Sequence, residues 1–352
     1  MVMKAQFWKN RRVLVTGHTG FKGGWLSLLL SHLGATVSGY SLEPSEENQF
    51  YKQVFKKGFI GEEIFSDITN YNEVKRSLKR FKPEIIFHLA AQPLVRLSYK
   101  NPSHTFSVNA MGVVNLLEAT RTSGFEPKIV NITTDKVYEN KEWVWAYRES
   151  DALGGNDPYS ASKACSEIIT NSYVNSFFKN SEVRIATARA GNVIGGGDMS
   201  QDRLIPDYLK AYKKNEEIVV RNPLATRPWQ HVIDPLSGYL QLAEMISSKD
   251  GEKFMGSWNF GPSGDPAAVG EIINSLSQIT GGLTYKLDKK SNPIEAQSLM
   301  LDSAKARTYL RWRPKLGLEQ ALRLTFDWFK NAENETDMQQ FSKAQISYYQ
   351  KL

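Results

Sequence analysis

A tyrosine and a lysine, Tyr159 and Lys163, are placed so that they could supply a base and a cation to one reaction. They begin a predicted helix at 159–178 that follows Pro158, and residues four apart lie on one face of a helix. A tyrosine of reference pKa about 10 must lose about three units to accept a proton near neutral pH, and a fixed ammonium supplies part of that shift. A solvated pair on a helix surface is the alternative interpretation.

Three further side chains that could take part in proton transfer directly follow a predicted strand at 128–133. They are Thr134, Asp135 and Lys136. Asp135 could donate a proton only if its pKa rose above the reference value of about 3.9, as burial would cause. Lys136, of reference pKa about 10.4, could act as a base after a large fall in its pKa or through a water molecule. Alternatively, its charge could stabilise an anion, and its role is left open.

Three glycines, Gly17, Gly20 and Gly23, stand between a short apolar run at 12–16 and a predicted helix at 22–33. In a strand–turn–helix setting, this spacing lets the backbone approach a pyrophosphate, whose charge the helix N-terminus favours. We therefore predict a dinucleotide site here, with a plain tight turn as the alternative. The residues between the glycines that join the predicted site are Thr19, Phe21 and Lys22.

The ends of the next two predicted strands hold the candidates for the ribose and the adenine. Ser41 ends the second strand, where NAD-binding proteins commonly carry an acidic residue that bonds the ribose hydroxyls. Serine can also bond the ribose, but it does not repel a 2′-phosphate, so NAD and NADP both remain possible. Asp67 and Ile68 resemble the pair that such proteins place against the adenine, and an N-cap for the next helix is the alternative for Asp67.

The elements that must position these residues alternate between β-branched apolar runs and helical patterns, which is typical of a doubly wound parallel sheet. Beyond Gly195 the elements become shorter and richer in glycine, proline and arginine. We predict a Rossmann-type α/β fold with a smaller C-terminal substrate-binding lobe. The dinucleotide-binding domain is expected at 1–192, with a segment near 231–262 returning to it, and the second lobe mainly at 193–352.

Composition excludes several classes of protein. The chain has 352 residues, five histidines without metal-ligand spacing and one cysteine, Cys165, so neither a metal site nor a disulfide is expected. The formal charge is +7, but acidic residues are interleaved with the Lys and Arg residues, so no nucleic-acid partner is expected. Without a membrane-length apolar run or a signal-like N-terminus, we expect a cytoplasmic protein with no membrane partner.

Together these motifs resemble the extended short-chain dehydrogenase/reductase family, and within it the nucleotide-sugar branch, over about residues 8–328. The resemblance also rests on a His-Leu-Ala-Ala-Gln segment at 88–92, Asn109, and an Arg-Ala-Gly-Asn-Val-Ile-Gly segment at 189–195. Three segments resemble the CDP-glucose 4,6-dehydratases in particular. They are Gly17–Trp25 (GHTGFKGGW), Thr133–Tyr138 (TTDKVY) and Arg221–His231 (RNPLATRPWQH).

The resemblance implies a hydro-lyase that uses NAD to convert CDP-glucose into CDP-4-keto-6-deoxyglucose and water, in deoxysugar biosynthesis of the lipopolysaccharide O-antigen type. It implies that Thr134 bonds the sugar 4-hydroxyl, that Tyr159 takes its proton, and that Lys163 holds the nicotinamide ribose and lowers the pKa of Tyr159. Asp135 would protonate the departing C6 hydroxyl. Lys136 departs from the commoner dehydratases, which carry a glutamate there as the C5 base.

The remaining contacts implied by the resemblance concern the cofactor, the substrate and a second subunit. Leu89, Ala90 and Ala91 would join the cofactor site. Asn192, Arg203 and Arg227 would bind the substrate diphosphate and nucleotide, as guanidinium groups suit phosphate oxygens; a surface ion pair is the alternative for each arginine. A homodimer is expected, through a four-helix bundle of the helices at 103–122 and 159–178.

Two other functions use the same residues differently. A nucleotide-sugar 4-epimerase or decarboxylase would share Tyr159, Lys163 and the glycine turn, but an epimerase expels no water, so Asp135 would be idle in it. A non-catalytic dinucleotide sensor would need none of the proton-transfer residues. Turnover with nucleotide sugars separates the three.

Overall fold

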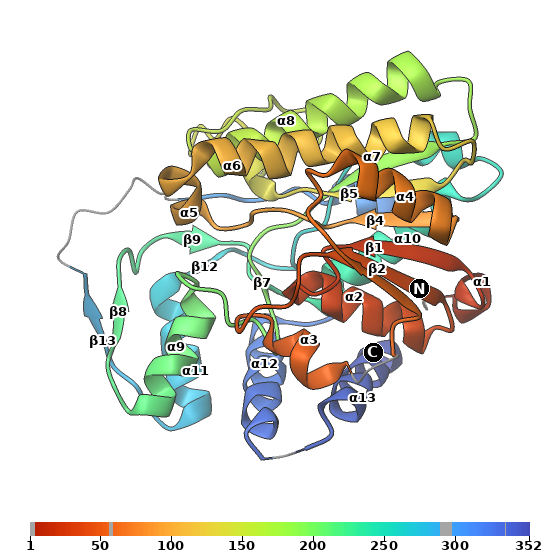
Figure 1. Cartoon of the computed structure of the whole chain (residues 1–352). Helices are drawn as coiled ribbons and strands as arrows, with labels where there is room; N and C mark the ends of the chain where they lie inside the picture. The colour runs from red at the N-terminus through yellow and green to blue at the C-terminus, as the bar shows by residue number, and fades with distance from the viewer. Residues whose placement is uncertain (1–3, 56–58, 289–297, 335) are drawn as a thin grey trace.

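A seven-stranded parallel sheet forms the centre of the protein (Figure 1). The computed structural model describes residues 4–55, 59–288, 298–334 and 336–352. The first six strands follow the Rossmann order 3-2-1-4-5-6, which confirms the predicted fold class, and a seventh strand extends the sheet beyond β6. In spatial order the strands are β3 (Glu62–Phe65), β2 (Thr36–Ser41), β1 (Arg12–Thr16), β4 (Ile85–His88), β5 (Lys128–Ile132), β6 (Arg184–Arg189) and β11 (Gly256–Asn259).

Helices cover both faces of this sheet because alternate strand residues point to opposite sides. Val13 and Val15 of β1 pack into one core with helices α2 (Phe21–His32) and α10 (Ile233–Ile246). Leu14, between them, packs into a second core on the other face with α4 (Tyr71–Phe81) and α7 (Gly112–Arg121). The segment expected to return to the first domain, near 231–262, thus contains α10 against this sheet and β11 within it.

Two long helical segments lie side by side on the second face, as Figure 1 shows. One consists of α6 (Pro102–Phe106), a π-helical turn η1 (Ser107–Met111) and α7. The other is α8 (Pro158–Tyr173), which continues as η3 (Val174–Phe178). Helix α8 begins where predicted because the Asp157 side chain accepts a hydrogen bond from the Ser160 N–H, and Pro158 needs no N–H partner at the first helical position.

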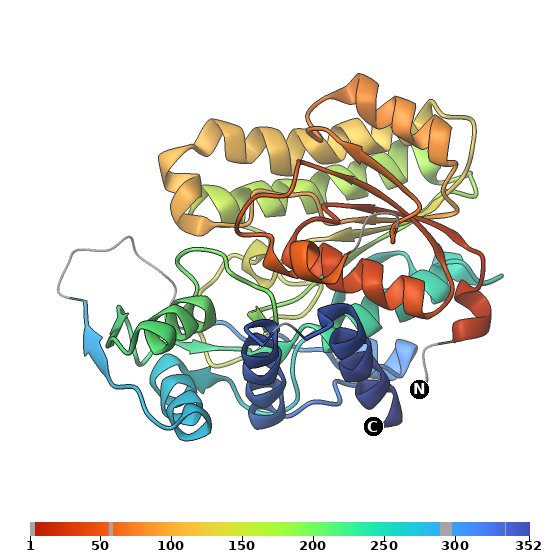
Figure 2. The same cartoon turned by 60° about the horizontal axis from the view of Figure 1, so that its bottom comes forward.

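The second lobe has a separate apolar core below the sheet (Figure 2). Its described residues form three short strand pairs, and the last helix of the chain packs against α2 and α3 of the first lobe. The elements of this part are β7 (Val193–Ile194), α9 (Leu204–Lys214), β8 (Ile218–Val220), β9 (Thr226–Arg227), β10 (Gln230–His231), β12 (Ala267–Ala268), α11 (Val269–Thr280), β13 (Tyr285–Leu287), α12 (Leu318–Ala332) and α13 (Met338–Lys351).

Two short helices, α3 (Gln49–Val54) and α5 (Val95–Lys100), were not predicted, because six residues are too few to show a clear helical period. The remaining helical elements are α1 (Ala5–Trp8), η2 (Asp135–Val137), η4 (Gly251–Phe254) and η5 (Ala306–Leu310). Within the described ranges, no helix has the length and apolar composition needed to span a membrane.

Candidate active site

The glycine turn forms a close-packed cradle between β1 and α2. Gly17 has φ of 74°, and a Cβ there would lie 2.8 Å from the backbone nitrogen of Ala90. A Cβ on Gly23 would lie 2.1 Å from the carbonyl oxygen of Gly17. Helix α2 starts after Gly20 without a side-chain cap, so the N–H groups of its first turn are left for a ligand. A pyrophosphate fits this combination of close backbone approach and unpaired donors.

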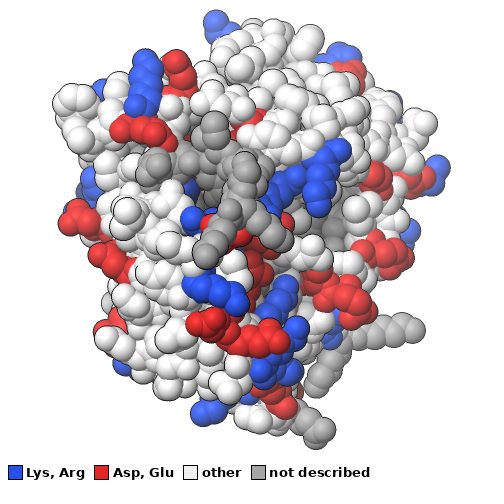
Figure 3. Space-filling view, turned by 90° about the vertical axis from the view of Figure 1, so that its left-hand side faces the viewer, with Lys and Arg blue, Asp and Glu red and all other residues white. Residues whose placement is uncertain are grey.

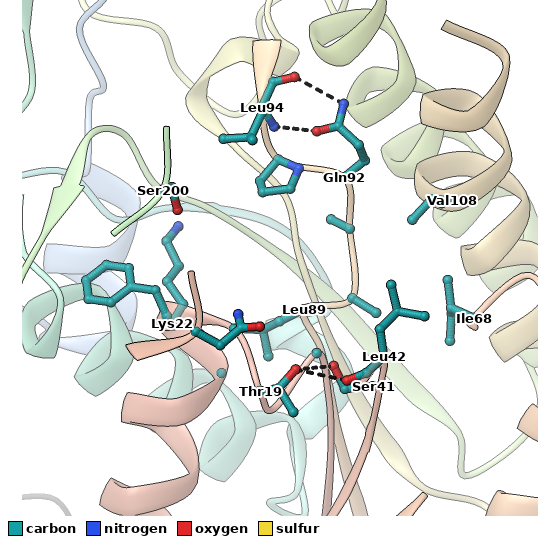
Figure 4. A pocket seen from close by; sticks show the side chains of 18 of the residues that line it. Thr19, Lys22, Ser41, Leu42, Ile68, Leu89, Gln92, Leu94, Val108 and Ser200 are labelled. Carbon is teal, nitrogen blue, oxygen red and sulfur yellow. Dashed lines mark hydrogen bonds between the residues drawn. The ribbon is translucent and has the colours of Figure 1, made fainter. Parts of the chain in front are cut away.

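A cavity of about 470 Å³ adjoins the turn, and we call it the cofactor cavity. Figure 4 shows part of its wall, with Lys22, Leu89, Ile68 and the hydrogen-bonded pair Thr19 and Ser41. Every residue predicted for the cofactor lines it. These residues are Gly17, Thr19, Gly20, Phe21, Lys22, Gly23, Ser41, Asp67, Ile68, Leu89, Ala90, Ala91, Tyr159 and Lys163.

The structure contradicts one alternative considered for Asp67. The N-cap of α4 is Asn70, whose side chain accepts a hydrogen bond from the Glu73 N–H. The Asp67 carboxylate instead accepts two hydrogen bonds from Thr69, both of 2.8 Å, in a turn at the cavity wall. The N-cap interpretation was wrong because the helix has its N-cap at Asn70, three residues after Asp67.

A second cavity, of about 480 Å³, holds the other half of the predicted site, and we call it the sugar cavity. Its wall includes every residue predicted for the substrate and most of those predicted for catalysis: Thr134, Asp135, Lys136, Tyr159, Asn192, Arg203 and Arg227. The two cavities share Lys22, Pro93, Leu94, Tyr159 and Arg203. Tyr159 therefore lies where a dinucleotide in one cavity would meet a sugar in the other.

Tyr159 and Lys163 are both buried, at 8% and 5% exposure. Lys163 donates a hydrogen bond to the carbonyl oxygen of Ile132 at 3.1 Å, and burial together with the charge of Lys22 lowers its pKa to about 8. Burial raises the pKa of Tyr159 to about 12, while Thr134 and Arg203 act to lower it. The expectation that Lys163 lowers the pKa of Tyr159 is therefore corrected, since burial outweighs the opposing effects and those come from other residues.

Asp135 is the most deeply buried acid of the sugar cavity, at 2% exposure. Its Oδ1 accepts a hydrogen bond from the Thr134 hydroxyl at 2.9 Å, and its Oδ2 has no partner among the described residues. Burial raises its pKa, as predicted, and the nearby charges of Lys136, Arg227 and Lys22 only reduce the rise. A carboxyl with a raised pKa and one free oxygen is equipped to hold and donate a proton.

The predicted substrate residues reach the sugar cavity from three separate segments of the chain. Arg203 precedes α9 and forms an ion pair of 2.6 Å with Asp198, the arrangement considered as the alternative for this arginine. It also lies in the wall of the sugar cavity. Arg227 is buried and donates to the carbonyl oxygen of Thr226, and Asn192 is half-buried. Figure 3, viewed from the side of β8, β9 and β13, shows Lys and Arg interspersed with Asp and Glu.

Similarity to known nucleotide-sugar enzymes extends over almost the whole chain. A family model described as GDP-mannose 4,6 dehydratase matches residues 14–325. A Salmonella typhimurium protein named CDP-glucose 4,6-dehydratase is 45% identical over 351 residues, which cover 97% of each chain. A Mus musculus protein named dTDP-D-glucose 4,6-dehydratase is 26% identical, over 92% of this chain and 90% of its own.

The chain belongs to the nucleotide-sugar 4,6-dehydratase family. This result confirms the predicted resemblance to the nucleotide-sugar branch of the extended short-chain dehydrogenases. A solved structure of the same fold, a Thermus thermophilus UDP-glucose 4-epimerase in complex with NAD, has a TM-score of 0.79 and 26% identity. The match covers 91% of this chain and 99% of the epimerase chain.

Behind the predicted catalytic residues of this dehydratase-family chain lies a buried ionic network that the sequence analysis missed. Glu167, one helical turn after Lys163 on α8, accepts hydrogen bonds from Thr133 at 2.6 Å and from Arg189 at 2.9 Å. Arg189 also donates to the hydroxyl of Tyr138 at 2.8 Å. Two features of the sequence could have indicated this network. One is an acidic residue on the same face of α8 as Lys163, and the other is an arginine that ends a buried strand.

Asn109, one of the residues on which the resemblance rests, lies in the π-helical turn η1. It bonds both the backbone of Gln92, at 2.8 and 3.1 Å, and the hydroxyl of Ser162, at 2.9 Å. It thereby fixes the segment after β4, which lines both cavities, against the helix that carries Tyr159. The extra residue of a π-helical turn displaces one face of the helix, which places this amide between the two elements.

Proposed function

We propose that the protein is a CDP-glucose 4,6-dehydratase that converts CDP-glucose into CDP-4-keto-6-deoxyglucose and water with NAD. The observation that carries the proposal is Asp135, because its buried carboxyl has a raised pKa and a free Oδ2 in the same cavity as Tyr159. A 4-epimerase has no leaving water and needs no such acid. The name of the Salmonella typhimurium relative supports the same choice of reaction and substrate.

The first step is oxidation at C4 of the sugar. Bound NAD supplies the chemistry of accepting a hydride from C4 and returning it to C6 at the end. Tyr159 takes the proton of the 4-hydroxyl, and Thr134, whose hydrogen bond lowers the pKa of Tyr159, orients that hydroxyl. Lys163, held by the carbonyl oxygen of Ile132 and buried on the cofactor side, holds the nicotinamide ribose.

The second step is loss of water across C5 and C6. The C4 ketone makes the C5 hydrogen acidic, which is why oxidation must come first. Asp135 gives its proton to the departing C6 hydroxyl, and Thr134 holds the other carboxyl oxygen in place at 2.9 Å. Lys136, half-buried in the same cavity, either takes the C5 proton through water or stabilises the resulting enolate with its charge.

The substrate diphosphate and nucleotide lie, in this proposal, against Asn192, Arg203 and Arg227. Arg203 is the group best placed to connect the two ligands, because it lines both cavities. Its pairing with Asp198 fixes the guanidinium in the wall before the ligand arrives, which reduces the entropy lost on binding.

The cofactor in this proposal is NAD rather than NADP. Ser41 does not repel a 2′-phosphate, but Glu43, two residues further on, lines the same cavity and carries a negative charge. The Thermus thermophilus structure with the same fold contains NAD. These observations resolve, in favour of NAD, the choice that the sequence left open at the end of β2.

We also propose a homodimer formed through the two long helical segments. Large apolar side chains are exposed along both of them: Phe106 and Met111 on the first, Ile168 and Phe177 on the second. Because the segments lie side by side, these side chains can form one apolar face that a second copy would cover. The division into an NAD-binding domain at 1–192 and a sugar-binding lobe mainly at 193–352, a cytoplasmic location, and a place in deoxysugar biosynthesis are further parts of the proposal.

The test is to incubate the purified protein separately with CDP-, dTDP-, GDP- and UDP-glucose and to analyse the products by mass spectrometry. Loss of one water from CDP-glucose alone is the expected result. An unchanged mass with formation of the galactose isomer would instead identify an epimerase, and no conversion of any nucleotide sugar would favour a dinucleotide sensor.

A further inference from the structure

Lys22 occupies an unusual position for a lysine. It lies in the first turn of α2, which contains no acidic residue, where the positive end of the helix dipole disfavours an ammonium. It lines both the cofactor cavity and the sugar cavity. Among the described residues, no hydrogen bond or ion pair involves its side chain, which in Figure 4 extends from the start of α2 toward Ser200. Within the described residues, its ammonium group therefore has no hydrogen-bonded or ion-paired partner of its own.

The charged groups around Lys22 come from every element packed against this junction. Arg203 before α9, Lys163 on α8, Asp135 in η2 and Asp198 after β7 all interact with it electrostatically. Asp198 is already paired with Arg203, and Asp135 lies in an environment that favours its neutral form. Burial and Arg203 lower the pKa of Lys22 to about 8, so it still carries a positive charge at neutral pH. The fold thus keeps an ammonium where burial, a helix dipole and another cation all oppose it.

The shared wall of the two cavities is where the proposed reaction would bring its two ligands together. A direct hydride transfer would require the sugar C4 and the nicotinamide ring to meet there, beside Tyr159, Arg203 and Lys22. The oxidised nicotinamide carries a positive charge, and the reduced ring is neutral. A fixed cation at this junction raises the energy of the oxidised form and leaves the reduced form almost unaffected.

We propose that Lys22 sets the redox balance of the bound cofactor, favouring the reduced nicotinamide over the oxidised one. The inference rests on the proposed function, since it assumes that the cofactor cavity binds NAD. The hydride and its two electrons leave C4, and Tyr159 receives the hydroxyl proton. The same hydride returns to C6 after water is lost, so no outside oxidant is needed. Lys22 therefore assists the first transfer, in which a sugar alcohol must reduce NAD, at the expense of the last.

Binding measurements test this without turnover. The Kd values of NAD and NADH are measured by calorimetry at pH 7, without a sugar nucleotide, for the wild type, Lys22→Met and Lys22→Arg. A unit charge within a ligand pocket predicts a change of about tenfold in the ratio Kd(NAD)/Kd(NADH). We expect this ratio to fall about tenfold in Lys22→Met and to stay near the wild-type value in Lys22→Arg. Lys9→Met, which removes an exposed lysine beyond α1, is the matched control and should leave the ratio unchanged.

A pH series on the wild type gives a second test that does not depend on the folding of a variant. Lys22 is charged below its pKa of about 8, so the preference for NADH should be present at pH 6–7 and decline as the pH rises through about 8. Lys163 has a similar pKa, and it remains in Lys22→Met. Because the charge of Lys22 helps to lower the pKa of Lys163, Lys22→Met should also move the Lys163 titration to higher pH, so the decline near pH 8 should be absent from this variant.

Equal weakening of NAD and NADH in Lys22→Met would show that Lys22 only binds phosphate, and an unchanged ratio would also refute the proposal. If the variant does not fold, a wild-type ratio that stays constant from pH 6 to pH 9 would refute it in the same way. Failure of the wild type to bind either dinucleotide would refute the proposed function itself. That outcome is distinct from the others, because in those the protein still binds the cofactor.

Discussion

Asp135→Asn should separate the two halves of the proposed reaction. The asparagine is the same size as the aspartate, and its Oδ1 can still accept the hydrogen bond of 2.9 Å from the Thr134 hydroxyl. What is lost is the acidic proton on Oδ2, the oxygen without a protein partner. Thr134, Tyr159 and Lys163 are unchanged, so oxidation at C4 should still occur while loss of water should not.

The size of the effect follows from the role of the residue. Removal of a general acid slows the step it serves by about 10²–10⁴-fold. The Oδ2 site is buried and lies only 2.7 Å from where a Cβ on Gly191 would be, so there is little room for a water molecule to replace the lost donor on that side. We therefore expect turnover to fall within this range, with oxidised sugar and reduced cofactor accumulating on the enzyme.

The assay is the absorbance of enzyme-bound NADH after mixing with CDP-glucose, together with mass spectrometry of the product. In Asp135→Asn the bound NADH should approach one per active site and decay slowly. In Tyr159→Phe, the comparison variant, it should not form at all. Normal turnover of Asp135→Asn, or a loss of NADH formation equal to that of Tyr159→Phe, would refute the assignment, and normal turnover would make an epimerase the better interpretation.

Three other substitutions test the cofactor turn, the link between acid and base, and the dimer. Gly23→Ala should destabilise the fold by about 1–3 kcal/mol and weaken NAD binding, because the new Cβ would overlap the Gly17 carbonyl oxygen. Thermal unfolding and calorimetry measure the two effects. Gly317→Ala is the control, since a Cβ at that position would meet no atom closer than 4.0 Å. Thr134→Val should raise the pKa of Tyr159 and so shift the limb of the pH–rate profile for C4 oxidation to higher pH, while an unshifted limb would contradict the contact. Ile168→Glu should give a monomer by light scattering. Tyr309→Glu, at another exposed apolar position, is the control and should not change the mass. A wild type that is already monomeric would refute the dimer.

The parts of the fold that sequence reasoning predicted are those written in local patterns. The strand–turn–helix at Gly17–Gly23 and the start of α8 at Asp157 and Pro158 each depend on a few neighbouring residues. Their positions were therefore predicted to within about a residue. The Rossmann order followed because alternating strands and helices allow few connections. The short helix α3 carries too short a pattern to be predicted this way.

The site was predictable as a set of residues but not as an electrostatic environment. The sequence placed Tyr159 and Lys163 on one helix face, and both line the expected cavity. It could not show that burial exceeds every cationic influence on Tyr159, because burial depends on the whole fold. The partners of Glu167 are Thr133, just after β5, and Arg189, at the end of β6, both far from it in sequence. Its role as the centre of an ionic network therefore had no local signal beyond its spacing from Lys163.

The same electrostatics prepare the two proposed proton-transfer residues to different degrees. Burial raises the pKa of both Tyr159 and Asp135, which favours the protonated form of each, and it lowers the pKa of Lys22 and Lys163 to about 8. Asp135 is then ready as an acid, whereas Tyr159 is not yet ready as a base. A substrate diphosphate beside Arg203 would engage one of the cations that oppose the rise in the Tyr159 pKa. The other group that lowers this pKa is Thr134, in the wall of the sugar cavity. Lys22 and Arg203 are the two charged residues that line both cavities, and Arg203 is paired with Asp198. Lys22 has no hydrogen-bonded or ion-paired partner among the described residues, so its charge should respond most to what the two cavities contain.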